Sequence, residues 1–253
     1  MTKANNYASV DNTAFLAARQ IAMDGISESA GIGTLAEKLL HRTLKLYFEP
    51  NEENHEIECL GSIADIKNSD GIIEIQTRAF DRLRPKLEKF LPECPVTVVY
   101  PIIKEKTILW LDKDSGEVSS ARKSPRRGLP SDALAELSKI KSMIGHESLT
   151  VLIVFLNAEE YRSLDGWDTE RKRGATKLER IPTEMIEIIE LKGVEDYKLL
   201  IPEKLPNEFS AKDFNRVAKL RARRASFSLK LLLDLGLLTR RHGEGRAYVY
   251  SRT

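Results

Sequence analysis

The chain has 253 residues, 42% of them hydrophobic, and a formal net charge of +2, which allows one large globular domain or two smaller ones. This composition argues against wholesale disorder, and the sequence contains no apolar run long enough to span a bilayer. Cys59 and Cys94 are the only cysteines and form no CxxC pair, which argues against a disulfide scaffold or a cysteine zinc site. The N-terminus lacks the basic-then-apolar pattern of a signal peptide, so a soluble, cytoplasmic protein with no membrane partner is expected.

The first predicted helix follows a polar, glycine-rich segment, residues 1–33, that is expected to be flexible. Thr34 is a typical N-cap residue, and Glu37 stands three residues later as its capping-box partner. An apolar face of Leu35, Leu39, Leu40, Leu44, Leu46 and Tyr47 then predicts an amphipathic helix that ends before Pro50.

Strands and helices alternate through the middle of the chain, which predicts the α/β class. Strands are expected over residues 56–67 and 72–78 around a hairpin turn, followed by a helix over 80–91 and a strand over 96–103. A hairpin over 106–120, a helix over 131–144 and a buried strand over 151–156 come next, while 184–191 fits either helix or strand. An α/β domain is therefore predicted over residues 34–204, with Pro202 and Pro206 marking the linker to a small domain over 205–253.

Positive charge is concentrated near the end of the chain. From Phe209 to Thr253 there are eleven Lys and Arg against three Asp and Glu, a net charge of +8 that leaves −6 for the preceding residues. Basic residues gathered on a small domain favour a polyanionic partner, because neutralised phosphates release counterions. Two further basic stretches, residues 122–127 and 171–177, could line a substrate channel, although such stretches are more often solvated loops.

The last residues follow the order helix, helix, β-hairpin, with Ser210 as the first N-cap and the second helix from Ala222 to Leu235. Through RARRASFSL, LGLL and TRRHGEGRAYVYS, this segment resembles the winged helix-turn-helix modules of bacterial regulators. The resemblance implies DNA contacts from the start of the second helix and from the wing. The residues expected to make them are Arg221, Arg223, Arg224, Ser226, Ser228, Arg240, Arg241 and Arg246. Alternatively, the module docks on a protein and its arginines serve solubility.

The hairpin GSIADIKNSDGIIEIQTR carries the residues most informative about chemistry. A four-residue loop would place Asp65 opposite Glu74, and a two-residue Asp70–Gly71 turn would place it opposite Gln76. Either register brings all three side chains to one face, because side chains alternate with period two. Facing carboxylates repel each other, and a divalent cation such as Mg²⁺ or Mn²⁺ would relieve that repulsion.

This pattern, Asp65 followed after eight residues by Glu74-Ile75-Gln76, resembles the PD-(D/E)xK nuclease superfamily. The resemblance implies a restriction-endonuclease-like mixed sheet flanked by helices, and a metal held by Asp65, Glu74 and the Ile75 carbonyl. Glu37 would assist from the first helix, with His41 one turn further along it. Ala64 replaces the usual proline, and Gln76 replaces the usual lysine, which stabilises negative charge and helps to activate water.

Three functions are compatible with these features. The first is a metal-dependent endonuclease that hydrolyses DNA phosphodiesters, uses Mg²⁺ or Mn²⁺ and is targeted by the winged helix. The second is a non-catalytic DNA-binding regulator on a decayed nuclease fold, which the glutamine at position 76 favours. The third is an interaction protein whose winged helix binds protein. An ordinary hairpin with a solvated acidic face would also produce the pattern, and a homodimer is allowed.

Overall fold

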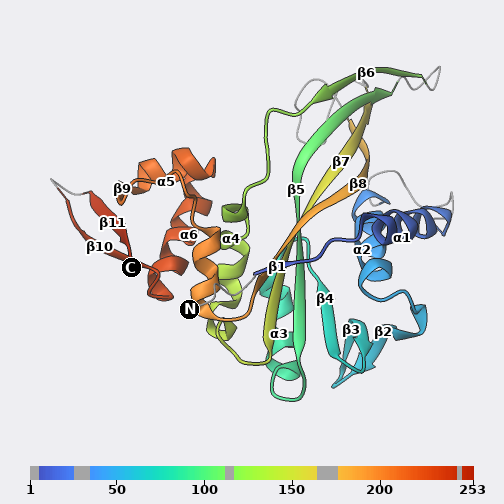
Figure 1. Ribbon diagram of the computed structural model, residues 1–253, viewed down its shortest axis with the longest axis horizontal. Helices are drawn as coiled ribbons and strands as arrows, with labels where there is room; N and C mark the ends of the chain where they lie inside the picture. The colour runs from blue at the N-terminus through green and yellow to red at the C-terminus, as the bar shows by residue number, and fades with distance from the viewer. Residues whose placement is uncertain (1–5, 26–34, 112–116, 164–175, 244–246) are drawn as a thin grey trace.

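The chain folds as a mixed α/β protein built on one large twisted sheet (Figure 1). The computed structural model describes residues 6–25, 35–111, 117–163, 176–243 and 247–253, and only the backbone of residues 35–38, 119–120 and 176–179. Among the described residues, no helix is both long enough and apolar enough to cross a membrane.

The large sheet contains both parallel and antiparallel ladders. Its strands are β1 (Tyr7–Ala8), β2 (His55–Cys59), β3 (Ser62–Asn68), β4 (Gly71–Ile75), β5 (Val96–Leu111), β6 (Val118–Lys123), β7 (Leu149–Ser163) and β8 (Thr176–Leu191). They lie in the order β1-β8-β7-β5-β4-β3-β2, and β6 pairs with β5. The β4–β5 and β5–β7 pairs are parallel and the other pairs are antiparallel. The predicted α/β class with a mixed sheet is confirmed.

Helices cover both faces of this sheet. On one face lie α1 (Asn12–Asp24) and α2 (Leu35–Phe48), and on the other lie α3 (Phe80–Phe90) and α4 (Leu134–Leu137). Short 3-10 helices complete the layers: η1 (Glu52–Asn54), η2 (Pro130–Asp132), η3 (Ser138–Met143) and η4 (Val194–Leu200). The alternation of side chains along the strands divides the core between the two faces: Val98 packs toward α3, and Val99 packs toward α2.

The last residues form a C-terminal module, residues 208–253. It consists of β9 (Glu208–Ser210), α5 (Ala211–Ala218), α6 (Ala222–Asp234), β10 (Leu238–His242) and β11 (Tyr248–Arg252), with a sheet in the order β10-β11-β9. The Ser210 hydroxyl accepts from the Asp213 amide, and the Asp213 carboxylate accepts from the Ser210 amide. The predicted N-cap at Ser210 is therefore confirmed, as is the order helix, helix, hairpin.

The module shares its hydrophobic core with the α/β body. Phe214, Leu229 and Leu232 of the module belong to the same buried cluster as Leu83 of α3 and Leu134 of α4. The predicted boundary after residue 204 therefore separates secondary-structure elements, but it does not separate two cores.

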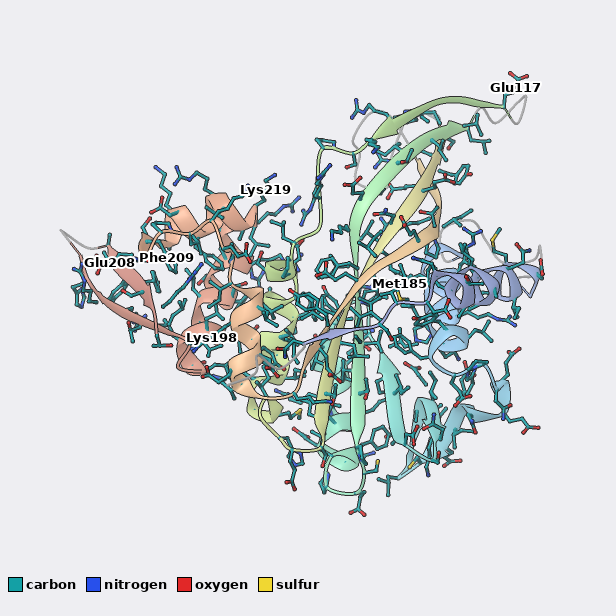
Figure 2. The ribbon with its side chains drawn as sticks, in the orientation of Figure 1. Glu117, Met185, Lys198, Glu208, Phe209 and Lys219 are labelled. Carbon is teal, nitrogen blue, oxygen red and sulfur yellow. The ribbon has the colours of Figure 1, made fainter. Side chains whose placement is uncertain are left out.

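The predicted flexible segment over residues 1–33 is wrong for its described part. Residues 6–25 form β1 and α1, while residues 1–5 and 26–34 lie outside the described residues. Buried Phe15, Ala18 and Ala22 recur at helical spacing: Phe15 packs against the sheet, and the two alanines pack against α2. The Asn12 side chain bonds both the amide and the carbonyl of Met185, the β8 residue marked in Figure 2, at 2.9 Å each.

Two other predicted elements are also divided. The single strand expected over 56–67 is the β2–β3 hairpin, because Leu60 and Gly61 form a tight turn with φ of 51° and 66°. The helix expected over 131–144 is split into η2, α4 and η3, with non-helical backbone at Ile140. The ambiguous segment 184–191 belongs to strand β8.

Three strands continue well beyond the helices. The outer ends of β5, β7 and β8, together with β6, form an arm that projects from the body, at the top of Figure 1. The predicted hairpin over 106–120 is the β5–β6 pair, which aligns Thr107 with Lys123, and its turn at 112–116 lies outside the described residues.

Candidate active site

The β3–β4 hairpin brings the two predicted acids to the same place. Its ladder runs from Asn68 opposite Gly71 to Ile66 opposite Ile73, so Asp65 and Glu74 are the next residues beyond its last pair, and the charge of Asp65 acts on Glu74. The Asn68 side chain accepts from the Asp70 amide at 3.0 Å and fixes the turn. The predicted register that pairs Asp65 with Gln76 is wrong, because Asn68 pairs with Gly71 and Ile66 with Ile73, and these pairs follow the register of the four-residue loop.

Asp65 lies where the β3–β4 ladder ends. Its Oδ2 accepts from the Ile75 amide at 2.8 Å and from His41 Nε2, on α2, at 3.2 Å. Burial opposes ionisation of this carboxyl, but the hydrogen bond and charge of His41, the Ile75 amide and the charge of Lys86 outweigh it and lower its pKa. Asp65 is therefore an ionised, oriented carboxylate at neutral pH.

The surroundings of Glu74 shift its pKa in the opposite direction to that of Asp65. Its side chain is only 2% exposed, and both of its carboxylate oxygens accept from Lys86 Nζ, at 2.9 and 3.0 Å. Burial first, and then the charge of Asp65, raise the pKa of Glu74 to about 7 despite the lowering effect of Lys86. A buried carboxyl that titrates near neutrality beside a second, ionised carboxyl is typical of functional sites.

Lys86 was not among the predicted site residues. It projects from α3, twelve residues after Glu74, beside the buried stripe of Leu83, Leu87 and Phe90. That stripe is visible in the sequence, and Lys86 lies next to it at helical spacing. Only the packing of α3 on the sheet, however, reveals that the ammonium group reaches the carboxylate of Glu74.

Two other predicted site residues are less informative. The Gln76 side-chain amide donates to the Arg78 carbonyl, and its backbone amide donates to the Val99 carbonyl at 2.9 Å. The residue before α3, Ala79, has a φ of 59°, a left-handed conformation that is costly for a residue with a Cβ. Glu37 lies on α2 as predicted, but its side chain is outside the described residues.

The donor set limits which metal could bind here. Among the described residues, no group of three or more His, Cys, Asp or Glu side chains is arranged to hold a metal. Asp65 and Glu74 supply carboxylate oxygens, and Mg²⁺ is commonly held by one or two carboxylates together with waters and substrate phosphates. A hard cation that keeps part of its water shell therefore fits these residues, whereas a closed zinc site does not.

The predicted DNA-contacting residues separate into exposed and inward-facing groups. Arg221, Arg223 and Ser226 are exposed at the start of α6. On β10, exposed Arg240 stacks over Tyr248 at 4.6 Å, and Arg241 pairs with Glu208 at 2.7 Å. The predicted contact at Arg246 lies outside the described residues.

One of these predicted contacts must be corrected, and a second lies between the C-terminal module and the α/β body. Ser228 is fully buried, and its hydroxyl donates to the Arg224 carbonyl at 2.9 Å, so it is a core residue of α6. Arg224 turns toward the α/β body and donates to the Asp132 carbonyl at 2.9 Å. Ala225, Leu229 and Leu232 define the buried stripe of α6, and Ser228 lies on that stripe.

Comparison with known proteins places the acidic pair within a recognised domain. A family model described as "Domain of unknown function (DUF8091)" matches residues 38–192, which is more than half of the chain. The chain belongs to this DUF8091 family. The DUF8091 domain contains Asp65, Glu74 and Lys86 and ends before the C-terminal module.

A relative shows that the similarity extends beyond this domain. An "Uncharacterized protein" of Treponema pallidum (strain Nichols) is 32% identical over 228 residues, covering 87% of each chain. This alignment is longer than the DUF8091 match, so it includes residues outside that domain. The search of solved structures finds no match to this chain.

Proposed function

We propose that this chain is a metal-dependent nuclease that hydrolyses DNA phosphodiesters. The observation that carries the proposal is that Glu74 is buried against Lys86 and lies close enough to Asp65 for the charge of Asp65 to help raise its pKa to about 7. Two neighbouring carboxylates that differ in protonation are costly to keep in a purely structural hairpin. In a site that binds a cation and a phosphate, the cation would relieve the repulsion between the two carboxylates.

The order of elements around the acids supports the same proposal. Helix α2, the antiparallel β3–β4 pair, helix α3 and the parallel strand β5 follow one another in the chain, and the acids lie on the central hairpin. This is the arrangement expected from the resemblance to PD-(D/E)xK nucleases. We accordingly propose a restriction-endonuclease-like core for residues 34–204.

Each residue of the site has a definable role in the proposed reaction. Asp65, Glu74 and the Ile75 carbonyl would hold Mg²⁺ or Mn²⁺, which supplies polarisation of the scissile phosphate and a lower pKa for attacking water. The hydrogen bond from His41 orients Asp65. Lys86 supplies the positive charge that Gln76 lacks, because its ammonium group lies beside both oxygens of Glu74.

The charge of the C-terminal module supports DNA as the substrate. The net charge of +8 over residues 209–253 includes Arg221, Arg223, Arg240 and Arg241, all of which are exposed. The order β9, α5, α6, β10, β11 agrees with the expected winged helix, in which the second helix and the wing contact DNA. We propose that the module binds the substrate through its phosphates.

A plasmid cleavage assay in Mg²⁺ or Mn²⁺ tests the proposal. The wild-type chain is compared with Asp65→Asn and with Asp70→Asn, a matched control in the exposed turn of the same hairpin. Asp65→Asn should abolish cleavage because it removes a metal ligand, and Asp70→Asn should cleave like the wild type. Equal rates for Asp65→Asn and the wild type would contradict the proposal.

A non-catalytic DNA-binding regulator is the second candidate function. It is favoured by Gln76, which replaces the usual lysine and donates its side-chain amide to the Arg78 carbonyl. The same assay separates the two functions. A regulator binds DNA with wild-type affinity in all three proteins and cleaves it in none of them, with either metal.

A further inference from the structure

A polar cavity lies between the arm, the α/β body and the C-terminal module. It has a volume of about 290 Å³ and is lined by the middle of β5, by residues from 124 to 132, by Arg180 of β8 and by Arg224 of α6. Figure 1 shows the segment that follows β6 running between the arm and the module, and Figure 2 marks Glu117 near the arm tip and Lys219 on the module. The cavity is separate from the acidic pair, whose residues do not line it.

The wall formed by residues 124–129, here called the strap, is held closely against β5. The Ser124 amide donates to the Lys106 carbonyl at 2.7 Å, and the Gly128 amide donates to the Lys104 carbonyl at 3.0 Å. A Cβ at Gly128 would lie 2.4 Å from the Ile103 carbonyl oxygen, so only glycine allows this approach. The cavity is therefore bounded by a fixed segment rather than by a passing loop.

Four cationic side chains line the cavity: Lys106, Arg126, Arg180 and Arg224. Lys106 and Arg180 both pair with a single buried carboxylate, Glu160, at 2.7 Å each, and Arg162 pairs with the same carboxylate. Arg126 pairs with Asp132 at 3.0 Å, whereas Arg224 binds the backbone carbonyl of that residue. Two carboxylates thus face five cations, and the surplus of positive charge adjoins the cavity.

We propose that this cavity binds a phosphate group, contacted by Arg126, Arg180 and Lys106 and by Arg224 from the C-terminal module. Arginine presents a planar fork of donors that matches phosphate oxygens, and lysine adds a compact charge. At the ~30 Å³ that a water molecule occupies in the liquid, the cavity has room for roughly ten waters, enough for a phosphate with part of its attached group.

The titration of Lys106 agrees with a local excess of positive charge. Burial is the largest cause that lowers its pKa, and the charges of Arg180 and Arg162 lower it further, although Glu160 acts in the opposite direction. An anion in the cavity would stabilise the charged form of Lys106. A self-contained structural network, by contrast, would leave no charge for a ligand to neutralise.

The phosphate has two possible sources, the backbone of a nucleic acid or a free phosphate compound. The nucleic-acid source rests on the proposed function, since the bound strand would lie between the arm and the module. Binding of a free phosphate compound is independent of it. In both cases Arg224 makes the site depend on the docking of the module, because Arg224 also donates to the Asp132 carbonyl of the body.

The test uses the full chain and substitutes neighbouring arginines of the strap. Arg126→Gln removes a cation of the cavity, and Arg127→Gln removes the adjacent cation, which pairs with Glu105 at 3.0 Å and does not line the cavity. Arg180→Gln is a second cavity variant. Binding of inorganic phosphate and pyrophosphate is measured by calorimetry at constant ionic strength, because surface charge is screened by salt. Binding of duplex DNA is measured by anisotropy in EDTA, so that cleavage plays no part.

Arg126→Gln and Arg180→Gln should each weaken phosphate binding at least tenfold, and Arg127→Gln should change it less than twofold. A parallel loss of DNA affinity assigns the phosphate to a nucleic acid, whereas unchanged DNA affinity assigns it to a free compound. Because the Arg126 side chain is 62% exposed, its variant keeps the test valid even if Arg180→Gln unfolds.

Phosphate and DNA binding that are equal in Arg126→Gln and Arg127→Gln would overturn the proposal. Asp65→Asn should retain full phosphate binding, so failure of the nuclease proposal remains distinguishable from failure of this one.

Discussion

Two buried glutamates in the same sheet have opposite electrostatic surroundings. Glu74, on β4, is 2% exposed, and its pKa is raised to about 7 by burial and by the charge of Asp65. Glu160, on β7, is 1% exposed, and its pKa is lowered to about 2 because Lys106, Arg180 and Arg162 outweigh the effect of burial. Burial is nearly equal at the two positions, so the neighbouring charges account for the difference.

The comparison distinguishes a carboxylate that stays ionised and has a structural role from one that can gain or lose a proton near neutral pH. Three cations hold Glu160 ionised over the whole physiological range, so it joins β5, β7 and β8 at the base of the arm. Glu74 has Lys86 on one side and the ionised Asp65 on the other, and it changes protonation near neutral pH. Substitutions at and around the two glutamates should either remove this contrast or make it measurable.

The largest expected effect is the loss of stability in Glu160→Gln. Removing this buried charge leaves three cations without their common partner, which should cost about 3–5 kcal/mol of unfolding free energy at pH 7. Because the folded-state pKa is lowered, the stabilisation is present above the ordinary value of 4.5 and is lost as the pH falls toward 2. Urea denaturation should show that Glu159→Gln, one residue earlier on β7, costs far less. Equal losses in the two variants would contradict the structural role of Glu160.

Glu74→Gln should have the opposite dependence on pH. The folded-state pKa is raised, so wild-type Glu74 costs stability increasingly as the pH rises from 4.5 to about 7. The variant lacks this cost and should gain relative to wild type over that window, by at most about 3 kcal/mol. Urea denaturation at pH 5 and pH 8 measures the difference. A constant difference between the two proteins would show that Glu74 has an ordinary pKa.

Lys86→Gln should reduce cleavage by about 10²-fold, the range expected for one electrostatic donor in an active site. Lys86 lowers the pKa of Glu74, so its loss should also move the pH at which Glu74 titrates upward. Lys89→Gln is the matched control, since Lys89 extends from the same helix toward Gly61 and Ser62. A merely structural Lys86 would lower stability without moving the pH profile of cleavage.

The smallest expected effect is that of Gln76→Lys, which would place a second cation beside the acidic pair. The pKa of Glu74 should fall by about one unit, worth about 1.4 kcal/mol, and its behaviour should approach that of Glu160. Cleavage should be kept or increased, because lysine is the usual residue at this position. A cleavage rate lower than that of Gln76→Ala would contradict the placement of residue 76 beside Asp65 and Glu74.

Local patterns in the sequence predicted the acidic hairpin well. The turn signal at Asn68–Gly71 and the period-two alternation were enough to bring Asp65 and Glu74 together, because these contacts are close in sequence. The same reasoning failed at Leu60, where a turn through Leu60 and Gly61 divides the single predicted strand into β2 and β3. It also missed α1, whose polar surroundings hid the buried spacing of Phe15, Ala18 and Ala22.

Side chains that meet through tertiary packing could not be predicted in this way. Lys86 reaches Glu74 only because α3 packs on the sheet, and Glu160 gathers cations from three different strands. The inward position of Ser228 was predictable in part, since it lies on the apolar stripe of α6. The turn of Arg224 toward Asp132 depends on the packing of the whole module against the body.

The continuous core beneath α3, α4 and α6 fixes the distance between the site of DNA binding and the site of cleavage in the proposed nuclease. The exposed start of α6 and the acidic pair are joined through packed side chains, so the span between them is fixed. Successive base pairs rise about 3.4 Å along a strand, and a fixed span therefore corresponds to a single cutting offset from the bound sequence. Extra residues inserted in the connection at 202–207 would leave that offset unchanged. A DNA-binding domain on a flexible linker would instead give a range of cleavage positions.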